Sequence, residues 1–234
     1  MAALHGVKVT VAKVDVSNRG EVYAWADQVV QDHGVVHMVF NNAGVAFAGS
    51  VADASCSDYE WLMGINFWGV VHGTKAFLPH LEASGKGHIV NMSSVFGLFS
   101  TPGMSAYNSS KFAVRGFTES LRQELELANS SVSATCVHPG GVRTNIAASA
   151  RLSEKLDTLP EETKADARKT FERLLKTTTP ERAAKAILRG VEKNSRRVLV
   201  GVDAYAADFM QRFLPSLHQW FVVTAMRLIK RWRG

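Results

Sequence analysis

The segment His88-Ile89-Val90-Asn91-Met92-Ser93-Ser94 is an apolar run of strand length that ends in two hydroxyl residues. A run of this kind is typical of a strand that is buried on both faces of a parallel sheet. The chain contains four further apolar runs of this type, at Val7–Val14, Val35–Phe40, Val132–Val137 and Arg197–Val200. The sequence therefore predicts a sheet of parallel strands.

Helix-like segments separate these runs, at residues 19–33, 57–83, 107–128 and 180–193. Ser17 and Asn18 precede the first segment and are good N-caps, while Gly34 follows it as a stop signal. Thr179 and Pro180 open the last segment, with Pro at a first helical position. Strands that alternate with helices predict an α/β fold with crossover helices.

The composition fits one globular domain over residues 1–234. Of the 234 residues, 46% are hydrophobic and 21% are charged, which is enough apolar surface for a sizeable core. The formal net charge is +6, and five Lys or Arg residues follow the last acid, Asp208. Without those five the net charge is +1, so the basic balance is local to the C-terminus and no nucleic-acid surface is expected.

Cysteine usage and the start of the chain indicate the compartment. Cys56 and Cys136 are the only cysteines and lie far apart in the sequence, so a disulfide framework is not expected and a reducing, cytoplasmic location is predicted. Residues 1–16 carry charges within their apolar run, unlike the apolar core of a secretory signal peptide. The longest uncharged stretch, Phe213–Met226, is too short to span a bilayer as a helix.

Small and polar residues follow three of the predicted strands. These turns are Asn41-Asn42-Ala43-Gly44, Ser93-Ser94 and His138-Pro139-Gly140-Gly141-Val142-Arg143-Thr144. Ligands of open parallel sheets bind beyond the carboxyl ends of the strands. Each turn alone is compatible with an ordinary loop that has no functional role. Their position after successive strands favours a common site.

A Tyr-x-x-x-Lys sequence, Tyr107 to Lys111, opens the predicted helix at 107–128. Residues four apart lie on one face of a helix, so the Lys111 ammonium can approach the Tyr107 phenol. A nearby positive charge favours the phenolate and should lower the pKa of Tyr107 toward the range of a proton donor or acceptor. A Tyr and a Lys at this spacing also occur by chance in many helices.

Together these motifs resemble the short-chain dehydrogenase/reductase family in order and spacing, from about residue 7 to about residue 203. The matching pieces are Asn41-Asn42-Ala43-Gly44, Asn66, Ser94, the pair Tyr107 and Lys111, and Pro139-Gly140 with Thr144. The resemblance implies a Rossmann-like, doubly wound parallel sheet. It also implies an enzyme that transfers a hydride between NAD or NADP and the carbonyl or secondary alcohol of a small molecule.

The resemblance assigns four catalytic residues. Tyr107 is expected to protonate the carbonyl oxygen during reduction, or to deprotonate the alcohol during oxidation, and Ser94 to orient that oxygen. Lys111 is expected to lower the pKa of the tyrosine and to bond the nicotinamide ribose. Asn66 resembles the helix asparagine that anchors a water molecule between the lysine and solvent.

The resemblance also assigns the cofactor-binding residues, and it predicts no metal site. Asp15 and Val16 are expected at the adenine ring, and Thr144 at the nicotinamide carboxamide. Asn42 and Gly44 belong to the loop under the adenosine ribose. The full predicted set is Asp15, Val16, Asn42, Ala43, Gly44, Tyr107, Lys111, Pro139, Gly140, Val142 and Thr144.

The sequence departs from the family at its start, where no Thr-Gly-x-x-x-Gly-x-Gly turn precedes Asp15. In the family this turn holds the pyrophosphate. The first two strands of the family fold are therefore expected to be missing, as in an N-terminally truncated sheet. Three explanations are open: an incomplete sequence, a naturally short regulatory or interaction protein without dinucleotide binding and catalysis, or a short form whose missing surface comes from another subunit.

This departure has a structural consequence for Val35–Phe40, which would lack the neighbour that it has in the family. An unpaired edge on a buried strand must be covered. We expect Val7–Val14 either to move beside Val35–Phe40, which gives a sheet of five strands, or to be disordered while another chain covers the edge.

Apolar residues near the site suggest the substrate class. Val95, Phe96, Leu98, Phe99 and Met104 follow the central strand and predict a pocket for a lipophilic ketone or alcohol. Residues 142–179 are rich in charge, Ala and Thr and are expected to form a helical flap over the substrate.

Two surfaces are expected to mediate contacts with partners. Apolar residues on the second and third helices, Trp68, Val71, Phe112 and Leu121, predict a homodimer or a homotetramer. The aromatic and basic C-terminal helix, at about 204–234, suits weak contact with a membrane surface. The same pattern suits a helix that packs beside the substrate opening.

The missing glycine turn predicts weak binding of the dinucleotide by the 234-residue chain. Without the amides that hold the pyrophosphate, we expect dissociation constants for NADH and NADPH in the high micromolar range or above. Fluorescence titration of the chain with each dinucleotide measures them. Tight, stoichiometric binding would show that other residues hold the phosphates.

Overall fold

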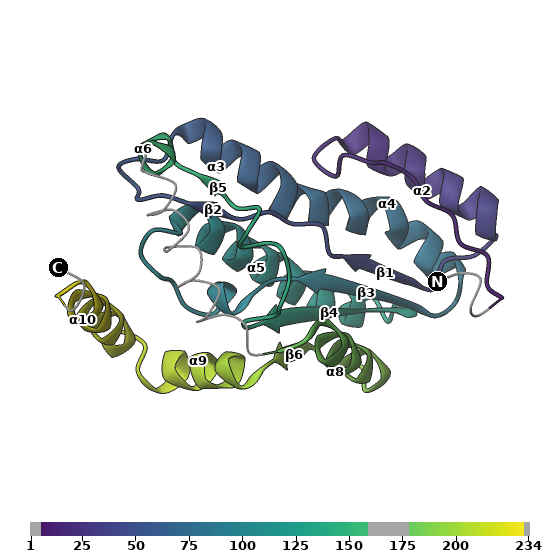
Figure 1. Cartoon of the computed structure of the whole chain (residues 1–234). Coiled ribbons are helices and arrows are strands. Elements are labelled where there is room, and N and C mark those ends of the chain that lie inside the picture. The colour runs from purple at the N-terminus through teal and green to yellow at the C-terminus, as the bar shows by residue number, and fades with distance from the viewer. Residues whose placement is uncertain (1–5, 159–177, 232–234) are drawn as a thin grey trace.

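A four-stranded parallel sheet forms the centre of the molecule (Figure 1). The structure is a computed structural model that describes residues 6–158 and 178–231. The strands are β1 (Met38–Asn41), β3 (Gly87–Met92), β4 (Val132–Pro139) and β6 (Arg197–Val200), in the order β1-β3-β4-β6. All neighbouring pairs are parallel. The predicted α/β fold with a parallel sheet is confirmed, and four of the five predicted strands form.

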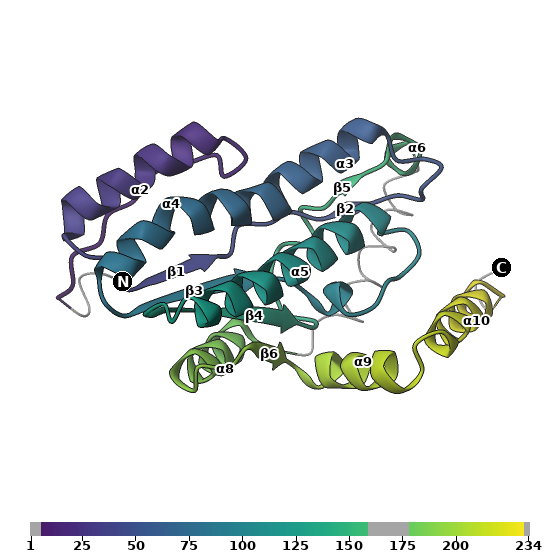
Figure 2. The same ribbon diagram turned by 180° about the vertical axis from the view of Figure 1, so that it is seen from behind.

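Helices cover both faces of this sheet (Figures 1 and 2). On one face, Leu81 and Leu121 pack with Ile89 and Ala134 of the sheet. On the other face, helical Ala183 packs with sheet residues in a second cluster. The helices are α2 (Arg19–His33), α3 (Cys56–Met63), α4 (Gly69–Ala83), α5 (Ser105–Leu127), α6 (Glu154–Asp157), α8 (Pro180–Glu192), α9 (Val202–Phe213) and α10 (Leu217–Arg231).

Capping residues fix the ends of the helices as the sequence predicts. The Asn18 side chain accepts hydrogen bonds from the amides of Gly20 and Glu21 at the start of α2. Gly34 ends that helix with a φ of 79°, in the left-handed region that favours glycine. At the start of α8, the Thr179 side chain accepts from the Arg182 amide. Both helices therefore lie within one residue of their predicted bounds.

The prediction of a strand at Val7–Val14 is wrong. These residues have no strand partner in the described chain; Val7, Val9 and Val11 are exposed. The segment instead lies along α2, where the Lys8 ammonium bonds the Asp32 carbonyl oxygen and Thr10 Oγ1 lies 2.9 Å from His33 Nε2. Alternating valines satisfy the pattern of a strand, but a strand also needs a neighbour for its backbone groups.

The outer edge of β1 therefore has no partner among the described strands: Val7–Val14 does not pair with it, and coverage by another chain stays a prediction. Met38 and Phe40 on this strand are 47% and 43% exposed. The sheet has four strands rather than five, and Val7–Val14 takes a defined path along α2. Among residues 6–15, only Val14 packs against the core cluster.

The single helix predicted at 57–83 contains a π-helical turn. α3 and α4 are joined by Gly64–Trp68, whose backbone follows the wider i to i+5 pattern. Asn66 lies within this turn and is fully buried. π-turns inside helices often occur at functional sites, because they rotate one side chain out of the helical register.

The substrate flap and the C-terminal helix differ from expectation where they are described. Residues 151–152 form a short strand, β5, which pairs in parallel with β2 (Phe47–Ala48). The predicted helical pattern around 163–175 lies outside the described residues. The single helix expected at 204–234 is wrong: α9 ends at Phe213 and α10 begins at Leu217, because Pro215 lies between them and cannot continue a helix.

A buried network of polar side chains joins the sheet to α4 and α5. The Asn41 amide donates to Asn91 Oδ1 at 2.8 Å and to Thr74 Oγ1 at 3.1 Å. The Asn91 amide in turn donates to Thr118 Oγ1 at 3.0 Å. Gly73 packs so closely on this network that an added Cβ would overlap the Asn41 side-chain oxygen. The network fixes how the two helices sit on the sheet.

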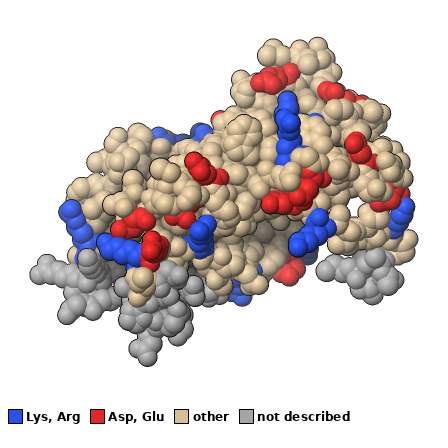
Figure 3. Space-filling model, turned by 90° about the horizontal axis from the view of Figure 1, so that it is seen from above, with Lys and Arg blue, Asp and Glu red and all other residues tan. Residues whose placement is uncertain are grey.

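The surface carries mixed charges and some exposed apolar residues. Figure 3 shows acidic and basic side chains interspersed over the face seen there. Trp68 and Phe112 are exposed as predicted, but Val71 and Leu121 are buried in this chain and are not available to a partner. Among the described helices, none is both long and apolar enough to cross a bilayer.

Two helical glycines give a matched test of this packing. Gly73→Ala should lower the free energy of unfolding by about 1–3 kcal/mol, because the new methyl group overlaps the Asn41 network. Gly116→Ala in α5 has nothing within 4 Å of the new Cβ and should raise the free energy of unfolding by about 0.5–1 kcal/mol. Urea unfolding of the two variants measures both free energies. The same change in the two variants would contradict the close packing of Gly73 against Asn41.

Candidate active site

A cavity of about 340 Å³ opens at the carboxyl ends of the sheet strands. The turns after β1, β3 and β4 all reach it, as expected for an open parallel sheet. The cavity is lined by nine of the predicted site residues, Asn42, Gly44, Ser94, Tyr107, Lys111, Pro139, Gly140, Val142 and Thr144. The strand-end motifs therefore predicted where these residues gather, although the cavity is lined from five separate segments, including α8.

Ser94 and Tyr107 form the hydroxyl pair of the cavity. Ser94 follows β3, and Tyr107 lies in the first turn of α5. A hydrogen bond with Ser94 lowers the pKa of Tyr107, but burial has the larger effect and raises that pKa above its ordinary value. The Tyr107 ring is held edge-on by Phe96, with ring centroids 6.2 Å apart. The phenol therefore keeps its proton and can donate it.

Lys111 is buried one helical turn after Tyr107. Its Nζ donates to the Met92 carbonyl oxygen at 2.9 Å and lies 5.6 Å from the centroid of the Tyr107 ring. Burial lowers the pKa of Lys111 to about 8. At neutral pH the side chain is therefore still mainly an ammonium, which can donate further hydrogen bonds into the cavity.

The prediction that the pKa of Tyr107 lies below its ordinary value is wrong for this structure, because burial raises that pKa. Spacing on the helix does bring the two residues together, as expected. The prediction omitted desolvation, which disfavours the charged form of both groups and therefore raises the tyrosine pKa while it lowers the lysine pKa.

The Asn66 side chain holds the loop that contains Gly44. Asn66 Oδ1 accepts from the Val45 amide at 2.8 Å, and Asn66 Nδ2 donates to the Val45 carbonyl oxygen at 2.9 Å and to Ser110 Oγ at 3.2 Å. A Cβ on Gly44 would lie 3.3 Å from Asn66 Oδ1 and 3.6 Å from Lys111 Nζ, which leaves little room for a side chain. Asn66 does not line the cavity, and its water-anchoring role stays a prediction.

The turn after β4 forms the opposite wall. An added Cβ at Gly140 would overlap the Asp203 carboxylate, and the Gly141 amide donates a hydrogen bond to Asp203 Oδ2. Only a glycine lets the turn and the start of α9 approach this closely. Val142 and Thr144 follow the turn and face the cavity.

Three predicted cofactor residues lie outside this cavity: Asp15, Val16 and Ala43. Asp15 is exposed, and hydrogen bonds from Ser17 lower its pKa. The Val16 carbonyl oxygen lies 3.1 Å from His72 Nδ1 on α4. These positions neither support nor contradict the predicted adenine contact.

Sequence reasoning assigned no role to several residues that shape the site. His138 is fully buried, and its Nδ1 donates to the Ser94 carbonyl oxygen at 3.1 Å. Ser93 Oγ donates to the Lys111 carbonyl oxygen at 2.8 Å. His138 directly precedes the Pro-Gly turn, which is a usable signal. Asp203 and the cavity residues of α8 had no such signal, because they are far from the motifs in sequence.

The residues at this cavity fit the nicotinamide and ribose of a dinucleotide. The cradle left by the missing Cβ of Gly44 lies beside the Lys111 ammonium, which can bond ribose hydroxyls. Thr144 lies on the same cavity and offers a hydroxyl to the carboxamide. In the described part of the chain, no cluster of three or more His, Cys, Asp or Glu side chains could hold a metal ion.

A larger hollow, of about 670 Å³, lies between α5 and the two C-terminal helices. Phe99, Asn108, Phe112 and His218 are among its lining residues. It contains none of the catalytic residues predicted from the sequence, so the smaller cavity is the candidate active site.

The fold and this site define an oxidoreductase of the Rossmann type, and comparison with known proteins identifies its family. The family model described as short chain dehydrogenase matches residues 1–155. The chain therefore belongs to the short-chain dehydrogenase/reductase family. It is an NAD(P)-dependent oxidoreductase of that family, and either NAD or NADP fits the resemblance.

Individual relatives cover nearly the whole chain. The oxidoreductase SadH of Mycobacterium tuberculosis is 47% identical over 232 residues, which are 99% of this chain and 82% of SadH. The Drosophila melanogaster dehydrogenase/reductase SDR family protein 7-like is 30% identical over 94% of this chain and 64% of its own length. A solved short-chain dehydrogenase/reductase from Burkholderia phymatum, in complex with NAD, has a TM-score of 0.81 and 31% identity over 93% of this chain and 79% of that chain. These similarities do not favour the non-catalytic alternative.

The buried histidine beside the site predicts acid sensitivity. Burial lowers the pKa of His138 from 6.5 to about 4. Below pH 6.5 the unfolded chain takes up a proton that the native state does not, so stability present above pH 6.5 is lost as the pH falls toward 4. This group should contribute a loss of about 3 kcal/mol over that window.

Urea unfolding at a series of pH values measures this loss. His138→Gln should flatten the decline between pH 6.5 and 4, whereas Lys111→Met should leave it in place because that group titrates near 8. If the free energy of unfolding fell equally between pH 6.5 and 4 in the wild type and in His138→Gln, His138 would not be the group responsible.

Proposed function

We propose that this protein interconverts a carbonyl group and a secondary alcohol on a lipophilic small molecule. The observation that carries the proposal is the convergence of Ser94, Tyr107 and Lys111 at one apolar cavity. Hydroxyl donors and a buried ammonium in one cavity are suited to proton transfer at a substrate oxygen.

The protein's own contribution is to orient the substrate oxygen and to move one proton. In reduction, Ser94 Oγ–H and Tyr107 Oη–H donate hydrogen bonds to the carbonyl oxygen. Tyr107 then transfers its proton to that oxygen as negative charge develops there. In oxidation the same phenolic oxygen, after losing its proton, accepts the proton of the alcohol.

Lys111 supports this proton transfer electrostatically. Its ammonium lies near the Tyr107 ring and stabilises the phenolate that forms when the proton leaves. In a buried site this stabilisation is stronger than in water, because the local dielectric is low. When bound, the nicotinamide ring supplies or accepts the hydride.

The lining of the cavity supports a lipophilic substrate. Ala46, Val95, Phe96, Met104 and Ile146 line the cavity together with the catalytic residues. An apolar wall with a few convergent polar groups is typical of sites for small apolar molecules.

The proposal also covers assembly and compartment. Trp68 and Phe112 are 51% and 37% exposed on the helices predicted to pair between subunits, which supports a homodimer or a homotetramer. Both cysteines are free, which supports a reducing, cytoplasmic environment.

Tyr107→Phe tests the catalytic assignment. The variant keeps the buried ring and loses only the proton carrier, so turnover with a lipophilic ketone should fall by about a thousandfold or more while the affinity for the dinucleotide changes little. Steady-state assays and dinucleotide titration measure the two quantities. Lys111→Ala should lower both the turnover and the affinity for the dinucleotide.

Tyr23→Phe is the matched control, because Tyr23 is exposed on α2 and touches none of the site. Its turnover should equal that of the wild type. If Tyr107→Phe kept more than a few per cent of the activity, another residue would have to be the general acid.

A further inference from the structure

The two C-terminal helices form an arm beyond the end of β6. Figures 1 and 2 show α9 and α10 running outward from the sheet. The arm is attached to the body by Asp208, whose carboxylate accepts two hydrogen bonds from Arg197 at 2.7 and 2.9 Å. His218 on α10 is 3% exposed and lies edge-on to Phe99, with ring centroids 6.4 Å apart. One side of the arm is therefore held against the rest of the molecule by these contacts.

The outer side of α9 is apolar. Val202, Tyr205, Phe209 and Phe213 are 83%, 61%, 62% and 66% exposed. Their spacing of three, four and four residues puts them on one stripe of the helix. The rings of Phe209 and Phe213 lie 4.5 Å apart, centroid to centroid. A helix that contacts only its own chain would turn such an apolar stripe toward the core of the molecule.

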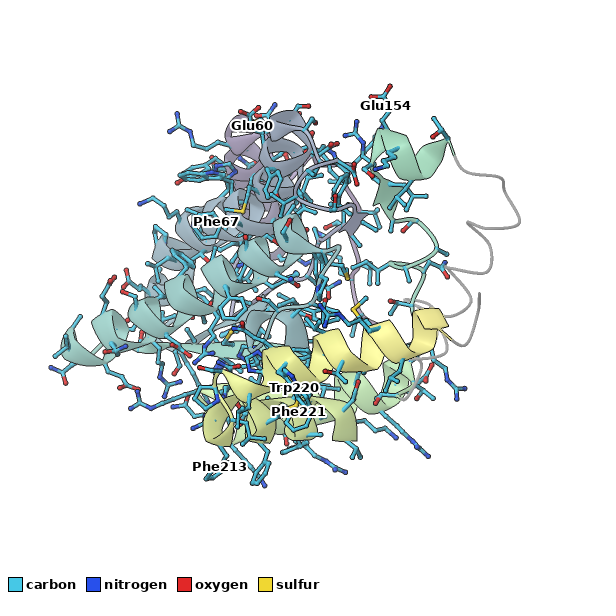
Figure 4. The ribbon with its side chains drawn as sticks, turned by 90° about the vertical axis from the view of Figure 1, so that its left-hand side faces the viewer. Glu60, Phe67, Glu154, Phe213, Trp220 and Phe221 are labelled. Atoms are coloured by element: carbon cyan, nitrogen blue, oxygen red, sulfur yellow. The ribbon has the colours of Figure 1, made fainter. Side chains whose placement is uncertain are left out.

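The outer side of α10 continues this apolar area. Leu217, Trp220, Phe221 and Leu228 are 56%, 61%, 47% and 52% exposed. Figure 4 shows Trp220 and Phe221 on α10 and Phe213 on α9, with Phe213 pointing away from the body. We call the eight residues of these two helices the arm surface. An apolar area of this kind marks a site of interaction.

Basic residues outnumber acidic ones in residues 202–234, where Arg212, Arg227, Lys230, Arg231 and Arg233 stand against Asp203 and Asp208. No acidic residue follows Asp208 in the sequence, whereas Lys or Arg occurs five times after it. Asp208 itself is neutralised by Arg197 and by Arg212, whose Nε lies 2.9 Å from Asp208 Oδ2. The arm therefore combines exposed aromatic residues with net positive charge.

These features favour one occupant over a second copy of the chain. Arg212 is already paired with Asp208, and the sequence after Arg212 adds four basic residues and no acidic one. Two copies joined through their arms would therefore bring like charges together, which costs repulsion energy. An anionic lipid surface attracts the same charges at about 1 kcal/mol for each Lys or Arg near it. Trp and Tyr also prefer the boundary between lipid and water, where a ring can be apolar on one side and polar on the other.

We propose that the arm surface binds the surface of an anionic phospholipid bilayer. The helices lie in the plane of the interface, with Phe209, Phe213 and Leu217 in the acyl region and Arg227 toward the headgroups. This is surface binding without a membrane span, in which apolar burial and charge each contribute.

Co-sedimentation of the full 234-residue chain with vesicles tests the proposal. The chain should bind vesicles of phosphatidylcholine mixed with phosphatidylglycerol, and should bind pure phosphatidylcholine much more weakly. Raising the salt until the Debye length falls from about 10 Å to about 3 Å should release most of the protein. Phe209→Ser with Phe213→Ser should weaken binding to the mixed vesicles by about tenfold or more.

The matched control is Leu127→Ser, which removes an exposed apolar side chain, 84% exposed, at the end of α5. It should bind the mixed vesicles as the wild type does, and thermal unfolding checks that both variants are folded. Failure of the wild type to bind the mixed vesicles would overturn the proposal, as would equal binding by the Phe209/Phe213 variant. If that variant instead changed the molar mass measured by light scattering without lipid, the arm surface would be an interface between copies.

Discussion

The hydrogen bonds of one buried side chain, Asn66, hold the active site together. Its carboxamide satisfies both the N–H and the C=O of Val45 and also reaches Ser110 on α5. Each of these hydrogen bonds to the half-buried backbone of Val45 is worth about 0.5–1.5 kcal/mol. The same bonds place Gly44 beside Lys111, so the strand-end loop, the π-helical turn and α5 are fixed relative to one another. The Ser94 hydroxyl meets Tyr107 within this frame.

Burial decides the protonation states inside that frame. It raises the pKa of Tyr107 and lowers that of Lys111 to about 8, because the low dielectric penalises phenolate and ammonium alike. The tyrosine therefore holds its proton in this state of the protein, and the Ser94 hydrogen bond only partly offsets the cost of ionisation. A site arranged in this way is ready to give a proton to a substrate oxygen. Acceptance of a proton requires additional positive charge or hydrogen bonds to stabilise the phenolate first.

Local signals in the sequence predicted local structure well. Asn18, Gly34 and the Thr179-Pro180 pair act within one helical turn, and the helices that they bound form at 19–33 and 180–192. The strand-end motifs also located the cavity, because parallel strands bring their carboxyl ends to one edge. The failures depend on distant partners. Val7–Val14 has the composition of a strand but no neighbour, and the π-turn at Gly64–Trp68 depends on how Asn66 bonds the loop after β1. Desolvation of Tyr107 likewise depends on packing that no short motif encodes.

One acidic side chain links the cavity to the C-terminal arm. Asp203 lies in the first turn of α9, accepts a hydrogen bond from the Gly141 amide and fills the space that a Cβ on Gly140 would need. Five residues further along the same helix, Asp208 binds Arg197 of β6. A rigid helix with both acids fixed cannot shift without straining the turn after β4, which lines the cavity. Because close-packed contacts transmit such shifts, the position of the arm and the shape of the cavity wall are set together.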